Sequence, residues 1–455
     1  MKFKVNRLGK IDSTEFELND LTIICGKNNT AKTYITYTLY GFIKFIDDLK
    51  FSVKPFFDEY FKNLDSQNPI QLPISVLNNF LYNDLVKQFS ITIPDIFSGN
   101  KILFQDSQIN IINHLHINNL EINRLSILGS YAIEIIKKPQ NDYILVKKTK
   151  FESEDVSYND SDIENLIQFS LERELKAIIR NDLLKDIPRV FISSVERSGI
   201  SLFQKEITLN RSNIYESIFA KLNSLNENRN KFNTYPIAIQ DNLKFVQRLF
   251  FTKQTPSEFI LNNNDIIGEF SDLIGGEYIL DKDNEEIKFI PTDSNLQLSM
   301  IESSSSIRAL CDLGIYLKFF AKVGDLIMID EPELNLHPEN QRKLGRLFAK
   351  LINKGIKILI TTHSDYIIKE LSILTIMYHN KDIISNINDI SNVKYNESNL
   401  ISPKKINVFL TEYDNGRIIL KPCEIDPHNG ILVSSFDDSI SDINNIMDEL
   451  AFMSS

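Results

Sequence analysis

Apolar and polar residues follow two periods along this chain, and together they predict an α/β fold. Residues 21–25 form a mainly apolar run, interrupted only by Thr22, that leads into a glycine, which is typical of a buried strand that ends in a tight turn. We expect four further core strands, over residues 189–192, 287–290, 325–329 and 357–361.

The segment between the last two of these strands has the pattern of an amphipathic helix. Pro338 stands near its start and Gly355 follows its end. The apolar stripe consists of Leu344, Leu347, Phe348, Leu351 and Ile352. A strand, a helix and a strand in this order predict a parallel crossover.

Long stretches interrupt this pattern. Residues 51–123 are polar and rich in Asn, and their pattern predicts no particular architecture. Residues 210–250 predict two amphipathic helices broken near Pro236, which form either an arm or lid or an ordinary helical subdomain. Strand-like pieces from residue 406 onward precede an acidic amphipathic helix over residues 438–453.

The composition of the chain argues against disulfide-rich, zinc-binding and membrane-spanning proteins. With 455 residues, of which 42% are hydrophobic, the chain can form two or three lobes. Its three cysteines form no CxxC pair, which argues against a disulfide framework or a zinc site and fits a reducing cytoplasm. No apolar run approaches the roughly 20 residues that span a bilayer, and the N-terminus lacks the apolar core of a signal peptide. We expect a cytoplasmic protein without membrane contact.

The net charge of −11 argues against a protein that coats nucleic acid through its overall field. DNA could be bound only by a local basic patch. The candidate patch brackets an apparent hairpin over residues 131–150 and consists of Lys137, Lys138, Lys147, Lys148 and Lys150. The same lysines also suit the plainer role of protecting an exposed sheet edge, which we favour.

One glycine-containing segment has the pattern of a phosphate-binding loop. It follows the first predicted strand and consists of Gly26, Lys27, Asn28, Asn29, Thr30, Ala31, Lys32 and Thr33. Backbone amides at a helix start can surround a phosphate, Lys32 can reach the β- and γ-phosphates, and the Thr33 hydroxyl can bind Mg²⁺. Ala31 replaces the usual glycine, and we expect it to be tolerated because the position begins the helix and needs no positive φ.

Two carboxylates follow the predicted strand 325–329. Asp330 is expected to hold Mg²⁺ together with Thr33, and Glu331 to polarise the water that attacks ATP. His363 follows the next strand, where its imidazole could donate a hydrogen bond to a γ-phosphate. An ordinary acidic turn and an incidental histidine are the alternatives, but the order and spacing of the three motifs favour the catalytic interpretation.

These motifs resemble those of the ABC-type ATPases allied to the OLD and SMC proteins. Residues 26–33 are similar to their Walker A motif, residues 329–338 to Walker B and the D-loop, and residues 359–364 to the H-loop. The resemblance implies that the D-loop, residues 333–337, lies at a dimer seam. The family's signature motif corresponds in position to Ser303, Ser304, Ser305 and Ser306. These serines are expected to touch the γ-phosphate bound by the other subunit.

The chain also departs from the family pattern. The serine cluster lacks the LSGGQ glycines, and no glutamine of a Q-loop can be placed. Slow or partner-dependent hydrolysis is expected from these departures. Residues 191–199 resemble a segment near the middle of the family's core, without an assigned role.

The resemblance implies an α/β P-loop NTPase fold, an ABC-type ATPase head with a mixed sheet flanked by helices and helical insertions. The expected parts are the N-terminal core with Walker A (1–50), an insertion (51–130), a core hairpin, helix and strand (131–205), a helical insertion (206–270), the core with the signature, Walker B, D-loop and H-loop (271–400), and C-terminal strands and a helix available to a partner (401–455).

Within this family the chain most resembles ATPase subunits of bacterial anti-phage systems such as PARIS and Septu. That resemblance implies a sensor and scaffold that binds ATP and Mg²⁺, forms a dimer or larger homo-oligomer, and controls a separate effector, a nuclease or toxin. The alternatives are a DNA-repair or SMC-like clamp, a transporter ATPase subunit and a non-hydrolysing nucleotide-gated adaptor.

An OLD-type enzyme would carry its own nuclease. Residues 408–412 form a strand that ends in Glu412, and two aspartates follow at 437–438, which faintly resembles a TOPRIM metal site. About forty residues after Glu412 are too few for that domain. We expect an ordinary strand that completes the core.

Overall fold

The computed structural model describes the chain except residues 55–56, 62–63, 65–67, 100, 113–119, 129–130, 151–159, 210–234, 253, 392, 434–444 and 448–455. The first of the two helices expected within residues 210–250 lies outside the described residues. So does the acidic helix expected over residues 438–453, apart from residues 445–447. Within the described ranges, no helix combines the length and the apolar character needed to cross a membrane.

Nine described strands form a mixed central sheet. They lie in the order β5 (Gln108–Ile111), β1 (Lys2–Leu8), β2 (Ile11–Glu17), β16 (Arg417–Pro422), β15 (Ile406–Asp414), β3 (Leu21–Gly26), β14 (Lys357–Thr362), β13 (Leu326–Asp330) and β9 (Val190–Ser193). The five strands from β15 to β9 are parallel. Their continuous apolar sequences suit strands that are covered on both faces. The expected α/β class is confirmed.

The register of the parallel strands brings the predicted motifs to one edge of the sheet. Cys25 on β3 lies opposite Thr362 on β14, and Thr361 lies opposite Asp330 on β13. Parallel strands end at a common edge, and in α/β sheets ligands bind outside that edge. The loop after β3, the acidic end of β13 and the residue after β14 are therefore neighbours.

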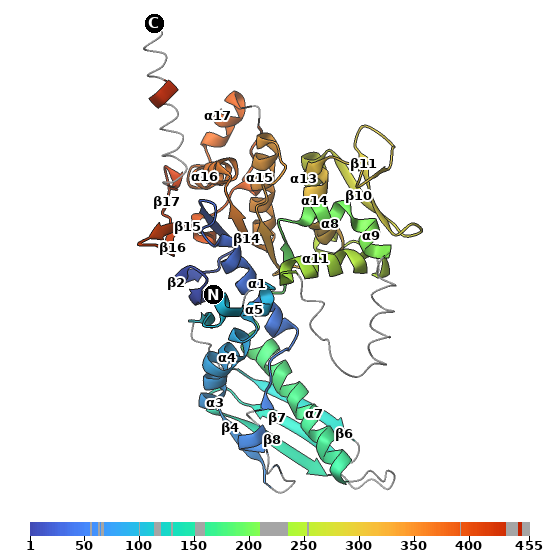
Figure 1. The fold of residues 1–455 in the computed structure, drawn as a ribbon, viewed down its shortest axis with the longest axis vertical. Helices are drawn as coiled ribbons and strands as arrows, with labels where there is room; N and C mark the ends of the chain where they lie inside the picture. The colour runs from blue at the N-terminus through green and yellow to red at the C-terminus, as the bar shows by residue number, and fades with distance from the viewer. Residues whose placement is uncertain are drawn as a thin grey trace.

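Alternate residues of the central strands face two separate hydrophobic cores. Ile24 and Met328 belong to the core beneath α1 (Lys32–Asp47), whereas Ile23 and Ile329 face the opposite side. That second side is covered by α13 (Asn264–Ile274), α14 (Ser305–Phe319), α15 (Pro338–Asn353) and α16 (Asp365–His379) (Figure 1). Both faces of the sheet are thus protected by helices.

Helix α15 confirms the predicted amphipathic segment. Pro338 is its first residue, the predicted apolar stripe is buried, and Gly355 follows the end of the helix with a φ of 88°. Strands β13 and β14 on either side of it are parallel neighbours, so the predicted crossover is also confirmed.

A four-stranded antiparallel sheet forms a lobe that extends away from the central sheet (Figure 1). Its elements are β4 (Ile70–Pro73), β8 (Tyr143–Lys150), β7 (Tyr131–Lys137), β6 (Ile122–Leu128) and the covering helix α7 (Asp160–Ile178). The hairpin over residues 131–150 was expected in the core, but it belongs to this lobe. The deciding contact is the pairing of β8 with β4, and local periodicity cannot reveal such a long-range pairing.

A second correction concerns residues 287–290. They lie in a strand as expected, but this strand belongs to a separate antiparallel sheet rather than to the central one. That sheet consists of β10 (Gly276–Asp281), β11 (Glu286–Pro291) and β12 (Leu298–Ser299). A short apolar run indicates burial but does not say in which sheet it is buried.

The remaining helices pack around these sheets. In the segment without a predicted architecture they are α3 (Ile74–Asn79), α4 (Leu85–Ser90), α5 (Ile93–Ile96) and α6 (Lys101–Phe104). Further along the chain they are α8 (Arg197–Leu202), α9 (Gln204–Leu209), α11 (Ile237–Arg248), α12 (Glu258–Leu261) and α17 (Ile383–Ile390). Helix α11 confirms the second helix predicted within residues 210–250. A small pair, β17 (Ile425–Asp426) and β18 (Gly430–Ile431), follows β16.

Candidate functional site

The loop between β3 and α1 forms one wall of a cavity. Gly26 has a φ of 138°, and a Cβ atom there would lie 2.2 Å from the Thr411 hydroxyl on neighbouring β15, so the turn requires glycine. Residues 28–33 line a pocket of about 630 Å³ together with Glu331 and His363. The loop, the acidic strand end and the histidine therefore share one cavity.

Ala31 at the start of α1 adopts a left-handed conformation, with φ 63° and ψ 20°. The expectation that this position needs no positive φ is therefore wrong. The loop reverses direction just before the helix begins, and Asn29 also has a positive φ of 61°. For a residue with a Cβ atom, this conformation costs about 1–2 kcal/mol. Glycine would adopt it without strain, which explains why the usual pattern has glycine here.

The ammonium group of Lys32 lies inside the loop. It donates hydrogen bonds to the carbonyl oxygens of Gly26 at 3.0 Å and Lys27 at 2.8 Å. Burial lowers the pKa of Lys32, and the carboxylates of Glu331 and Asp330 act against this shift. Lys27, by contrast, is exposed. Of the two lysines in the loop, Lys32 is the one fixed beside the acidic end of β13.

The two residues expected to hold Mg²⁺ are adjacent. Thr33 Oγ1 lies 3.2 Å from Asp330 Oδ2, and the Thr361 hydroxyl also donates to the Asp330 carboxylate. Burial raises the pKa of Asp330, and the hydrogen bond from Thr361 partly offsets this rise. Oxygen ligands bind Mg²⁺ at about 2.0–2.1 Å, so two oxygens at this separation can occupy neighbouring positions around the ion. The site fits magnesium.

Glu331 and His363 face each other across the pocket. Glu331 Oε1 lies 3.3 Å from His363 Nε2, and this hydrogen bond lowers the pKa of the Glu331 carboxyl. Glu331 has a φ of 51°, and its N–H donates to the carbonyl oxygen of Thr361 at 3.0 Å and to the Thr361 hydroxyl at 3.1 Å. A strained residue held by several hydrogen bonds is typical of an active site.

Glu333, the first residue of the expected D-loop, binds the backbone of His363. Its carboxylate accepts hydrogen bonds from the His363 N–H at 2.5 Å and from the Thr362 hydroxyl at 2.9 Å. Burial raises the pKa of Glu333, and the hydrogen bond from the His363 amide counteracts the shift. Glu333 therefore fixes the segment that carries His363. The sequence pattern did not predict this contact.

The four serines lie at the start of α14 and outside the pocket. Ser303 is buried and donates to the carbonyl oxygen of Ser299 at 2.8 Å, while the Ser304 side chain caps the helix by accepting from the Ile307 N–H. Ser305 is exposed and Ser306 is half-buried. The structure thus brings together the other predicted site residues but leaves the serines apart from them.

The pocket is also lined by residues that sequence reasoning missed. They are Gly9, Lys10, Tyr34, Leu103 and Ile418. Tyr34 packs against Phe97 and Phe104, with ring centroids 5.2 and 5.4 Å away. Leu103 and both phenylalanines come from the segment whose pattern predicted no architecture, so no sequence signal pointed to them.

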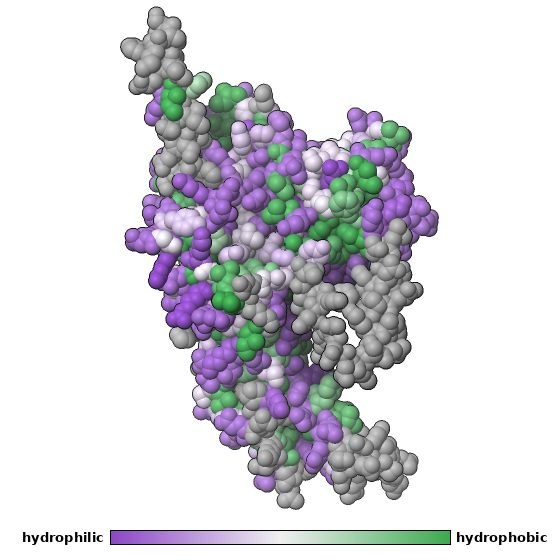
Figure 2. Space-filling model, in the orientation of Figure 1, coloured by the Kyte–Doolittle hydropathy of each residue, from purple (hydrophilic) through white to green (hydrophobic). Residues whose placement is uncertain are grey.

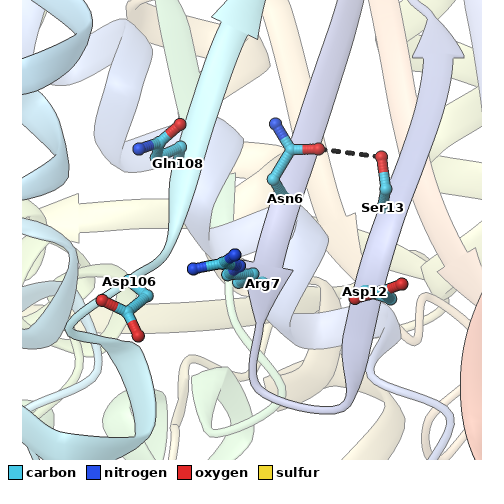
Figure 3. A pocket seen from close by; sticks show the side chains of 6 residues that line it. All are labelled: Asn6, Arg7, Asp12, Ser13, Asp106 and Gln108. Atoms are coloured by element: carbon cyan, nitrogen blue, oxygen red, sulfur yellow. Dashed lines mark hydrogen bonds between the residues drawn. The ribbon is translucent and has the colours of Figure 1, made fainter.

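A second hollow, of about 430 Å³, lies at the edge of the central sheet (Figure 3). It is lined by Asn6, Arg7, Asp12, Ser13, Asp106 and Gln108. The first four come from β1 and β2, and Gln108 begins β5. None of the predicted site residues lines this hollow.

The proposed basic patch is largely occupied by contacts within the lobe. The Lys137 side chain is buried and donates to the carbonyl oxygen of Lys138 at 3.2 Å. Lys147 lies 3.7 Å from a Glu134 carboxylate oxygen, and Lys148 lies 5.0 Å from the centre of the Tyr131 ring. These contacts support the structural role of the lysines more than a role in DNA binding.

The C-terminal strand is an ordinary strand of the core, as expected. The strand that ends near Glu412 is β15, which lies between β16 and β3 in the central sheet. Residues 437–438 lie outside the described residues. Among the described residues, no group of three or more His, Cys, Asp or Glu side chains could hold a metal ion.

One family model matches most of this chain. The family model described as an AAA ATPase domain matches residues 1–368. No curated protein matches the chain in sequence. Among solved structures, the SMC head domain from Thermotoga maritima is 11% identical with a TM-score of 0.33, and the match covers 93% of this chain and 98% of that one.

Two further solved structures are similar at the same level. The Smc head bound to the C-terminal winged-helix domain of ScpA is 11% identical, with a TM-score of 0.34 and coverage of 92% of this chain and 97% of that one. The Smc head with an extended coiled coil, bound to the C-terminal domain of ScpA from Pyrococcus furiosus, is 13% identical, with a TM-score of 0.32 and coverage of 98% of both chains.

Proposed function

Because the chain belongs to the AAA ATPase domain family, we propose that it binds ATP with Mg²⁺ in the pocket beside β3 and hydrolyses it to ADP and phosphate. The observation that carries this proposal is the convergence of Lys32, Asp330 and Glu331 from segments some three hundred residues apart. Phosphoryl transfer needs positive charge, a metal ligand and an orienting carboxylate at one place, and these residues supply all three.

Each residue has a proposed task. Lys32 and the amides of the loop bind the β- and γ-phosphates. Asp330 and Thr33 would hold Mg²⁺, which would neutralise charge on the phosphates. Glu331 orients and polarises the attacking water, and His363 donates a hydrogen bond to the γ-phosphate.

We further propose that hydrolysis requires two copies of the chain. The support is the position of Ser305, which is exposed, and of Ser306, which is half-buried: both lie at a helix start and do not line the pocket of their own chain. A helix N-terminus carries partial positive charge and suits a phosphate. In a face-to-face dimer these serines would contact the γ-phosphate bound by the partner subunit.

Glu331→Gln tests both proposals. The variant keeps the shape of the side chain but removes its charge, so ATP should still bind while turnover is lost. ATP would then act as a ligand of the closed dimer and stabilise it by roughly 2.7 kcal/mol at about a hundred times its dissociation constant. We expect a larger, ATP-dependent species on a sizing column. Wild-type turnover in a folded Glu331→Gln protein would refute the assignment of Glu331, and an unchanged size with ATP would refute the dimer.

The biological role that we propose is that of a sensor and scaffold in bacterial anti-phage defence, which controls a separate nuclease or toxin. The support is by analogy: the Walker B, D-loop and H-loop segments resemble those of the ABC-type ATPases allied to the OLD and SMC proteins, a family that includes the ATPase subunits of such systems. The test is phage plating on cells that carry this gene with its genomic neighbours. Protection that is lost in the Lys32→Ala variant is expected, and equal plating with and without the intact genes would contradict the role.

A further inference from the structure

The side chain of Arg197 lies at the junction of four elements and is only 1% exposed. It occupies the first position of α8, directly after the turn that follows β9. Arg197 belongs to residues 191–199, which resemble a segment near the middle of the family's core. That resemblance implies no role for Arg197. The structure shows what the guanidinium contacts.

Four hydrogen bonds connect this guanidinium to main-chain carbonyl oxygens. Nη1 donates to Asp330 O at 2.6 Å and Nη2 to Glu331 O at 2.6 Å, so the group binds the acidic end of β13. Nε donates to Ala309 O in α14 at 2.8 Å, and Nη1 also donates to Ser194 O at 3.0 Å. One side chain therefore joins the catalytic strand end to the helix that begins with the serine cluster.

Burying a charged group without a directly paired charge is costly, and burial lowers the pKa of Arg197. Within the described residues, no carboxylate lies within ion-pair distance of its guanidinium. The charge is instead dispersed over carbonyl oxygens, with the negative charges of Asp312 and Asp330 nearby. Such an arrangement fixes geometry, because a planar guanidinium with five donors can hold several carbonyls at set positions.

The geometry that it fixes includes a strained residue. Glu331 has a φ of 51°, in the left-handed region. Its peptide groups are held on one side by the backbone and hydroxyl of Thr361 and on the other by Arg197. Without the second contact, the backbone of Glu331 could relax and its carboxylate would leave its place opposite His363.

Ser198, the next residue of α8, also connects this helix to the serine cluster and to the D-loop segment. The Ser198 hydroxyl donates to Ser305 O at 3.3 Å and lies 3.5 Å from Nδ2 of Asn335 in the D-loop segment. The start of α8 thus touches both surfaces that a partner subunit is expected to meet, as well as the backbone of the catalytic carboxylate.

We propose that Arg197 is a positioning residue for ATP hydrolysis, which holds Glu331 in its catalytic position and couples that position to the serine helix α14. This inference rests on the proposed ATPase function. When α14 engages nucleotide bound by a partner subunit, a shift of Ala309 is transmitted through one rigid side chain to the backbone of Glu331. Hydrolysis thereby depends on the contact between subunits.

The test compares Arg197→Lys with a matched control, Arg189→Lys. Arg189 directly precedes β9 and joins the start of β13 to the end of α14, since its guanidinium contacts Asp325 at 2.6 Å and the carbonyl oxygen of Phe320 at 2.8 Å. A lysine at either position keeps the charge but not the fork of donors. Each variant is assayed below its own unfolding transition for ATP affinity, kcat and ATP-dependent assembly. Arg197→Gln replaces the lysine variant if that protein does not fold.

We expect Arg197→Lys to lower kcat by on the order of 10²-fold, the typical cost of misplacing a catalytic group by about 1 Å. ATP affinity should stay within about threefold of wild type, and the slowly hydrolysing variant should accumulate the ATP-dependent dimer. Arg189→Lys should lose thermal stability while keeping its kcat.

Other outcomes overturn the inference. A wild-type kcat in Arg197→Lys, an equal loss of kcat in Arg189→Lys, or a parallel loss of ATP binding would leave Arg197 as a general structural residue. Glu331→Gln separates this failure from a failure of the proposed function. If Glu331→Gln is inactive while Arg197→Lys is fully active, only the positioning role is wrong. If Glu331→Gln hydrolyses ATP normally, the proposed function itself fails.

Discussion

At the scale of single residues, the loop holds the Lys32 ammonium group where a phosphate is proposed to bind. This group is held by two loop carbonyls beside two carboxylates. Lys32→Ala should weaken ATP binding by about 2–5 kcal/mol, which is roughly 30-fold to 4,000-fold in affinity. Titration with a fluorescent ATP analogue checks this. Lys27→Ala is the matched control, because Lys27 belongs to the same loop but is exposed, and equal losses in both variants would contradict the specific role of Lys32.

Ala31 offers a test of strain at the same loop. Its φ of 63° is unfavourable for alanine and favourable for glycine. Ala31→Gly should therefore stabilise the protein by up to about 1 kcal/mol, after subtraction of the entropy that glycine adds to the unfolded chain. Urea denaturation measures the change. Ala349→Gly in the buried interior of α15 should instead destabilise by about 1 kcal/mol, and destabilisation by Ala31→Gly as well would show that the left-handed turn is not strained.

At the scale of elements, the start of α14 is an exposed surface with a proposed role between subunits. Ser305→Arg should leave ATP binding nearly unchanged but impair hydrolysis, because the bulky side chain would separate the two subunits. Binding titration and phosphate release measure the two effects. Ser385→Arg, at an exposed position of α17, adds the same charge and should be neutral. Loss of ATP binding in Ser305→Arg would place the serine in its own chain's pocket.

Individual strands and helices also show which parts of the fold could be predicted from the sequence. The strands that end in Gly26 and Asp330 and the helix after Pro338 were predicted because local periodicity and punctuation define them. The conformation of Ala31 was mispredicted, because it depends on how the loop reverses rather than on its sequence pattern. The role of Arg197 could not be predicted, because three of its four carbonyl partners lie more than a hundred residues away and a contact to a backbone carbonyl leaves no pattern in the sequence.

At the scale of the whole molecule, the outline of the ATPase core was predictable but its accessory parts were not. The lobe that contains β6 to β8 depends on pairing with β4, and Leu103 lines the pocket beside the phosphate-binding loop. Neither β4 nor Leu103 belongs to a segment with a recognisable motif. Figure 2 shows that apolar and polar side chains are interspersed over the visible surface, which is normal for a folded protein and identifies no site by itself.

One contact spans nearly the whole chain and can be tested. The Thr411 hydroxyl donates to Cys25 O at 3.0 Å and lies 2.5 Å from the Thr30 hydroxyl, so β15 supports the phosphate-binding loop from behind. Thr411→Val should cost about 1–3 kcal/mol of stability and weaken ATP binding. Thr375→Val, which removes only a local bond within α16, should leave ATP affinity unchanged. Unaltered ATP affinity in Thr411→Val, measured by calorimetry, would contradict the support by β15.

That contact also sets an order of events during synthesis. Cys25 and Thr411 are 386 residues apart in the chain. At about 5–20 residues per second, a ribosome needs on the order of twenty to eighty seconds to make the second after the first. Until then β3 lacks its neighbour β15, and the backbone N–H and C=O groups along that edge are open to wrong partners. The nascent chain therefore carries an incomplete nucleotide pocket through most of its translation, and β3 is exposed to mispairing during that time.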